Sequence, residues 1–168
     1  MEEANQIMIN QVVSGGQTGA DEAGLIVAKE FGILTGGWAT KDFRTQDGKK
    51  PQYKELYGMK EMSTYDYQAR TYQNVKDSDG TIRIYYDKKS AGEKCTLNAI
   101  LTYNKPYFDV NLREENDPVL AVQWIQKNNI KILNVAGNSE KTALGITQDA
   151  SDYLRKLFNL LKNEDIKT

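Results

Sequence analysis

Residues 14–19 read Ser-Gly-Gly-Gln-Thr-Gly and separate two segments of different character. The preceding residues, Ile7 to Val13, are rich in β-branched side chains, which favours a buried strand. The following residues carry small or apolar side chains at helical spacing from Ala20 to Phe31, and Gly32 can end that helix in the left-handed conformation. This strand–loop–helix unit predicts an α/β protein whose glycine loop is a candidate ligand site.

The rest of the chain repeats this alternation. We predict strands at residues 33–35, 81–86, 106–110 and 130–136, and helices at residues 65–76, 96–103, 118–128 and 146–161. Strands that alternate with helices form a mostly parallel sheet with helices on both faces. We therefore expect one Rossmann-like domain over residues 1–168, a three-layer sandwich with a mainly parallel five-stranded sheet. Residues 39–61 show no such pattern and are expected to form one long irregular segment.

Composition limits the classes of partner. The 22 basic and 23 acidic residues leave a formal net charge of -1, so we expect no nucleic-acid or membrane partner. No apolar run reaches the length of a membrane span, and residues 1–10 do not resemble a leader, so a cytoplasmic location is expected. The single cysteine, Cys95, cannot form an internal disulfide.

The sequence contains no histidine. This excludes Ser-His-Asp and Cys-His catalysis, an imidazole base and histidine-containing zinc sites. Carboxylates, lysine, tyrosine or a metal held by oxygen ligands remain for catalysis. No catalytic set or metal site is recognisable, and we expect a protein that binds its ligand rather than converting it.

The glycine clusters share one position in the predicted architecture. Gly15, Gly16 and Gly19, then Gly37, Gly92 and Gly137, each follow a predicted strand. The carboxyl ends of parallel strands meet at one edge of the sheet, where ligands bind. Backbone N–H groups and a helix N-terminus favour phosphate there. The spacing matches neither the dinucleotide fingerprint nor the Walker motif, and such glycines also serve as packing turns.

Three further groups are candidates for this site. Arg70 and Asn74 share a helical face, and the Arg70 guanidinium can hold a phosphate with two hydrogen bonds. Lys41 and Arg44 lie in the long irregular segment and are candidates for a lid, although a solvated basic loop fits them as well. Trp38 is a candidate for stacking on a base or pterin ring, or a packing residue. Asn138 follows the last strand and extends its loop of backbone donors.

The order of these motifs resembles the molybdenum carrier family, part of the SLOG group of Rossmann-like proteins that bind nucleotides or nucleotide-derived ligands. The resemblance rests on SGGQTGAD at residues 14–21, GGW at 36–38, RT and NV at 70–71 and 74–75, DSDGT at 77–81 and NVAG at 134–137. It implies a pocket that is lined by Gly15, Gly16, Gln17, Thr18, Gly37, Arg70, Asn74, Asp79, Thr81, Thr96 and Gly137. The chain departs from the family at Ala39-Thr40, Phe43, Ala91-Gly92 and Asn138.

The resemblance implies a carrier or sequestering protein for molybdenum cofactor or a nucleotide-derived molecule, with self-association into a homo-oligomer. Two alternatives stay open. One is a sensor or sponge for ADP-ribose-type or cyclic nucleotide signals. The other is a nucleotide phosphoribohydrolase like the cytokinin-activating enzymes, whose Pro-Gly-Gly-x-Gly-Thr-x-x-Glu motif is absent and for which Glu93 is a poor positional substitute.

Overall fold

The computed structural model describes residues 9–167 of the chain, and its side chains through residue 163. Its central sheet contains β1 (Gln11–Val13), β2 (Leu34–Gly36), β7 (Gly80–Tyr85), β8 (Tyr107–Asn111) and β9 (Ile132–Gly137) in the order β2-β1-β9-β7-β8. Every neighbouring pair is parallel. This confirms the predicted five-stranded sheet. The first two residues of the strand predicted from Ile7 lie outside the described residues.

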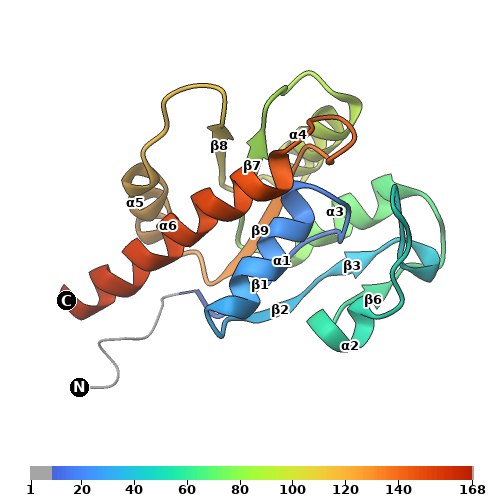
Figure 1. Ribbon diagram of the computed structural model, residues 1–168, viewed down its shortest axis with the longest axis horizontal. Coiled ribbons are helices and arrows are strands. Elements are labelled where there is room, and N and C mark those ends of the chain that lie inside the picture. The colour runs from blue at the N-terminus through green and yellow to red at the C-terminus, as the bar shows by residue number, and fades with distance from the viewer. Residues whose placement is uncertain (1–8, 168) are drawn as a thin grey trace.

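Helices cover both faces of the sheet, which confirms the three-layer sandwich (Figure 1). One face is covered by α1 (Ala20–Glu30), α5 (Pro118–Lys127) and α6 (Ile146–Lys167), and the other by α3 (Tyr67–Asp77) and α4 (Ala91–Tyr103). The main apolar core lies on the α1/α5/α6 side, where Val12, Leu133 and Val135 are buried with Leu157 and Phe158 of α6.

The opposite face of the sheet is polar. In β7, Ile82 and Ile84 belong to the main core, and because side chains alternate along a strand, Thr81 and Arg83 point to the α3/α4 side. Both are buried. In the neighbouring β9, Asn134 donates a hydrogen bond of 3.1 Å to the Thr81 hydroxyl. Helices α3 and α4 therefore enclose a hydrogen-bonded polar layer, and the candidate site opens from this layer.

The segment from residue 39 to residue 61 differs from the prediction of one irregular loop. It contains η2 (Lys41–Phe43), β4 (Arg44–Thr45), β5 (Gly48–Lys49) and α2 (Tyr53–Tyr57), and β3 (Trp38–Ala39) pairs with β6 (Lys60–Glu61). Phe43, Tyr53, Tyr57 and Met59 form a second apolar cluster with Leu25 of α1. The segment is therefore a small packed unit held against α1.

Helix α4 begins five residues before the predicted start at Thr96, because Ser90 caps it and accepts a hydrogen bond from the Glu93 amide. The early start brings Gly92 and Glu93 into the first turn of the helix. Among the helices that the structure describes, none combines the length and apolar character that crossing a membrane requires.

Candidate functional site

A cavity of about 290 Å³ lies beyond the carboxyl ends of β1 and β9, between the first glycine loop and helices α3 and α4. Its volume is at the lower end of the range for ligand pockets, which suits one small molecule of mononucleotide size. The wall is polar. It consists of Gly15, Gln17, Asp21, Gln46, Tyr67, Arg70, Thr71, Asn74, Ser90, Ala91, Gly92, Thr96, Asn134, Ala136, Gly137, Asn138, Ser139 and Thr142.

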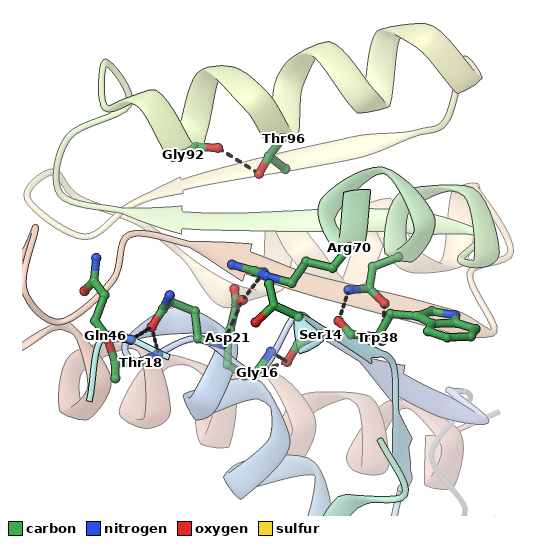
Figure 2. A network of polar contacts seen from close by, with 12 residues as sticks. Ser14, Gly16, Thr18, Asp21, Trp38, Gln46, Arg70, Gly92 and Thr96 are labelled. Atoms are coloured by element: carbon green, nitrogen blue, oxygen red, sulfur yellow. Dashed lines mark hydrogen bonds and ion pairs between the residues drawn. The ribbon is translucent and has the colours of Figure 1, made fainter. Parts of the chain in front are cut away.

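An ion pair between α3 and α1 forms one side of this cavity. Figure 2 shows the Arg70 side chain reaching from α3 toward Asp21 at the start of α1. The Arg70 Nη1 atom lies 3.3 Å from the Asp21 Oδ2 atom, and both residues are buried. Burial raises the pKa of the Asp21 carboxyl to about 6, although the Arg70 charge and the Gln17 amide oppose that rise. Asp21 is thus a buried acid that titrates near neutral pH.

Gly15 makes room for this ion pair. A Cβ atom at residue 15 would lie 1.8 Å from Arg70 Nη1 and 2.9 Å from Asp21 Oδ2. The guanidinium therefore lies directly against the glycine backbone. The missing side chain of Gly15 serves the approach of Arg70, where the sequence suggested the approach of a ligand phosphate.

Three amides of the first glycine loop already have acceptors within the protein. The Gly16 amide donates to the Ser14 hydroxyl at 3.2 Å, and the Gln17 amide donates to Asp21 Oδ2 at 3.3 Å. The Thr18 amide donates to the Gln17 side chain at 3.0 Å. A carboxylate of the chain itself thus lies at the position where the sequence predicts an anion of the ligand.

The opposite side of the cavity comes from α4 and the loop after β9. Gly92 and Thr96 contribute from α4, Ser90 contributes from the N-cap of this helix, and Ser139 contributes a hydroxyl from the loop. The Asn138 side chain accepts hydrogen bonds from the Tyr86 and Asp87 amides at 2.8 and 3.0 Å, so it joins the ends of β7 and β9. This side combines a helix N-terminus with the hydroxyls of Ser90 and Ser139, which suits an anionic group. The Ser90 hydroxyl accepts hydrogen bonds from the Glu93 amide and the Asn138 side chain, and the Ser139 hydroxyl bonds with Thr142.

The structure brings eight of the sequence-predicted site residues into the cavity wall: Gly15, Gln17, Arg70, Asn74, Gly92, Thr96, Gly137 and Asn138. Gly16, Thr18 and Gly19 belong to the first glycine loop but do not line the cavity themselves. Thr81 is fully buried and holds Asn134, which is itself in the wall. Gly37 packs so closely on β1 that a Cβ atom there would lie 2.2 Å from the Ser14 carbonyl oxygen.

Four predicted site residues lie away from the cavity wall. Trp38 donates from Nε1 to Asp77 at 3.1 Å, and its ring faces the Lys60 ammonium. Lys41 and Arg44 both lie about 5.5 Å from the centre of the Tyr65 ring.

The fourth, Asp79, precedes β7 and lies at the amino edge of the sheet, opposite the cavity. Its carboxylate accepts hydrogen bonds from the Lys131 and Ile132 amides at 3.0 and 2.8 Å.

The prediction missed wall residues that carry much of the polarity, chiefly Asp21, Asn134 and Gln46. The signal for Asn134 was present, because it is the polar residue among the apolar residues 132–136 of a predicted strand. Asp21 is the last residue of the SGGQTGAD motif, but an acidic residue in the first turn of a helix usually faces solvent and stabilises the helix dipole, so its place in the wall was not indicated.

Glu93 lies behind the wall, in the polar layer between α4 and the sheet. It is 1% exposed, and neither carboxylate oxygen has a hydrogen-bond partner. Burial raises the pKa of this carboxyl to about 8, against the opposing charge of Arg83, while Asp21 and Asp109 raise it further. Arg83 is held by Asp109 through hydrogen bonds of 2.7 and 2.6 Å. At neutral pH Glu93 is therefore largely protonated and neutral.

Among the described residues, no group of three or more His, Cys, Asp or Glu side chains is placed to hold a metal ion. The donors around the cavity are amides, hydroxyls and a guanidinium. These groups hold phosphates and the polar edges of heterocycles.

Comparison with known proteins gives two matches. Residues 12–158 match the circularly permutated YpsA SLOG family. The chain also matches a crystal structure from Syntrophus aciditrophicus that carries the name "Putative molybdenum carrier protein". The two sequences are 35% identical, the match covers 90% of this chain and 96% of that chain, and the TM-score is 0.83. No curated protein matches. The family match includes every residue of the cavity wall.

Proposed function

This chain belongs to the circularly permutated YpsA SLOG family, and on that premise we propose that it is a binding protein, a carrier or sequestering module, for a small phosphate-bearing ligand. The observation that carries the proposal is the buried guanidinium of Arg70 in the wall of a small polar cavity. A buried guanidinium holds phosphate with short, charge-assisted hydrogen bonds. Hydroxyls from Ser90 and Ser139 support the same chemistry from the opposite side.

The size and donors of the cavity narrow the ligand class. A volume of about 290 Å³ fits a mononucleotide or a pterin phosphate better than a dinucleotide. The side-chain amides of Gln17 and Asn134 suit the polar edge of a heterocycle. The Asn74 amide is bound at both ends to the Trp38 backbone, at 2.8 and 2.9 Å, and shapes the wall. Because a structural relative is named a molybdenum carrier, molybdenum cofactor is one candidate cargo under this proposal, and a nucleotide derivative is the other.

A second candidate function is hydrolysis of a nucleotide. The observation in its favour is Asp21, a carboxyl in the cavity wall whose pKa of about 6 suits general acid–base catalysis near neutral pH. Neither Asp77, which binds Trp38, nor Asp79 at the opposite edge of the sheet reaches the cavity. Asp21 is therefore the carboxylate whose removal tests for catalysis.

Calorimetry combined with chromatography separates the two functions. The protein is titrated with AMP, cyclic AMP, ADP-ribose and inorganic phosphate, and each mixture is analysed for products after prolonged incubation. The binding proposal expects stoichiometric binding with the ligand recovered unchanged. Sustained turnover that Asp21→Asn abolishes, while Glu30→Gln at the far end of α1 retains it, would establish the hydrolase instead. No binding of any of these compounds would contradict both the hydrolase and a carrier whose cargo is a nucleotide derivative.

Two further proposals follow from the family assignment. We propose that the protein acts in the cytoplasm and that it forms homo-oligomers. Sedimentation analysis of the purified protein tests the second proposal, because a carrier that works as a monomer would sediment at the 19.0 kDa mass of one chain.

A further inference from the structure

The charged groups of the cavity wall are balanced. Within the described part of the chain, Asp21 and Arg70 are the charged side chains that line the cavity, and they face each other at 3.3 Å. The Asp21 carboxylate also accepts a hydrogen bond from the Gln17 amide. Its Oδ2 atom therefore binds both the first glycine loop and the Arg70 guanidinium. As it stands, this side of the cavity presents a neutral pair to a ligand.

An anionic ligand would disturb this balance. A phosphate that approaches the Arg70 guanidinium also approaches the Asp21 carboxylate, because the two groups are hydrogen-bonded to each other and both lie beside Gly15. In a buried site two like charges at such short range repel strongly, and one cation cannot compensate both. The repulsion is removed when the carboxyl takes up a proton, because the neutral acid no longer competes for the guanidinium.

We propose that the Asp21 carboxylate occupies the place of the ligand's anionic group at Arg70, so that a phosphate-bearing ligand displaces it from the ion pair and Asp21 takes up one proton from solvent. This inference rests on the proposed function and adds its regulation: ligand is held more tightly as pH falls and released as pH rises. The pKa of about 6 for Asp21 in the ion pair places the change in the neutral range.

The other titratable groups around Asp21 do not supply this coupling. From α4, Glu93 faces Asp21, but its oxygens are buried in the polar layer behind the wall. Arg83 and Asp109, from β7 and β8, pair with each other. Cys95 of α4 lies near Arg70, and burial raises the pKa of its thiol, which keeps it neutral. From α3, Arg70 contributes the guanidinium of the ion pair itself.

The test measures proton uptake directly. Cyclic AMP, ADP-ribose and inorganic sulfate are suitable probes, because none carries a group that titrates between pH 6.5 and 8. Calorimetric titrations in buffers of different ionisation enthalpy give the number of protons taken up per probe bound. The affinity is then followed across the same pH range. We expect uptake of about 0.5–1 proton at pH 7 and an association constant that falls by about tenfold per pH unit above pH 6.5.

Three variants assign the proton. Asp21→Asn keeps the shape of the side chain without its charge, so binding should become independent of pH and at least tenfold tighter than wild type at pH 8. Glu93→Gln should keep the wild-type pH dependence. Glu30→Gln is the matched control, because it removes an exposed carboxylate from the last residue of α1, about 13 Å along the helix from Asp21.

The outcomes are distinct. Binding without proton uptake by the wild-type protein would overturn this inference and leave the proposed function intact, a result that needs no variant to fold. Proton uptake that survives Asp21→Asn would also overturn it. Failure of every probe to bind at every pH would overturn the proposed function together with the inference.

Discussion

Gly15 controls the position of Arg70, because any side chain at residue 15 would meet the guanidinium. We predict that Gly15→Ala folds, since Arg70 can swing its flexible end away, but binds cyclic AMP at least tenfold more weakly. That loss corresponds to one hydrogen bond to a charged group, about 1.5–3 kcal/mol. Calorimetry at pH 6.5 measures the affinity, and circular dichroism verifies the fold.

Gly92 supplies the control for this substitution. It also lines the cavity, but a Cβ atom there would meet nothing within 4 Å. Gly92→Ala should therefore keep the fold and stabilise α4 by up to about 1 kcal/mol. If Gly15→Ala bound cyclic AMP as tightly as wild type, the placement of Arg70 against the glycine would have no role in binding.

Glu93 makes the stability of the fold depend on pH. Its carboxyl pKa rises from 4.5 to about 8 on burial, so the folded protein keeps a proton that the unfolded chain releases. The free energy of unfolding should therefore fall as pH rises from about 4.5 to about 8, by roughly 3–5 kcal/mol from this residue. Glu93→Gln should flatten this part of the profile in urea unfolding measured at several pH values. An unchanged slope in the variant would refute the assignment.

The part of the candidate site that could be predicted consists of residues that directly follow a strand, because their place in the sequence determines their place in the sheet. The first glycine loop and Gly137 follow strands, and parallel strands end at one edge, so their convergence was predictable. Asp79 entered the predicted pocket through the family resemblance and not through this reasoning. It lies next to β7 in the sequence, but it precedes the strand, which places it at the amino edge instead. The burial of Asp21 could not be predicted, because it depends on Arg70 from a helix 49 residues away.

The packed segment between β2 and α3 was the part of the fold that the sequence predicted least well. Its strands are two residues long, and β3 and β6 exist through a pairing of residues that lie more than 20 positions apart. Local periodicity carries no information on such a pairing. The longer helices were predictable, because their apolar positions recur at helical spacing and caps such as Asp117 mark their starts.

Met59 tests whether this segment is a folded unit. It is 2% exposed, packs in the second apolar cluster and lies beneath Gly16 of the first glycine loop. Met59→Ala should lower the free energy of unfolding by about 2–4 kcal/mol, because it leaves a cavity among Leu25, Tyr53 and Tyr57.

Urea denaturation measures this change. Leu56→Ala is the matched control, because Leu56 lies in α2 of the same segment and is 42% exposed, so its loss should cost less than about 1 kcal/mol. Equal effects of the two substitutions would show that the segment is not packed against α1 in solution.

The order of the strands in the sheet brings the loops of the candidate site together. The last strand of the chain, β9, lies between β1 and β7, so the first glycine loop and the loop after β9 are adjacent although more than 110 residues separate them (Figure 1). The Ala20 amide donates to the Asn138 carbonyl at 3.0 Å and joins the two loops directly. Five parallel strands could be predicted from the alternation. The central place of β9 could not, because it depends on which strands pair.

Native mass spectrometry of freshly purified wild-type and Arg70→Ala protein tests the central claim most directly, with identification of any small molecule released on denaturation. We predict that wild-type protein carries a phosphate-bearing molecule at up to one per chain and that Arg70→Ala carries little or none. A released molecule without phosphate, or the same occupancy in both proteins, would contradict a phosphate site built on Arg70.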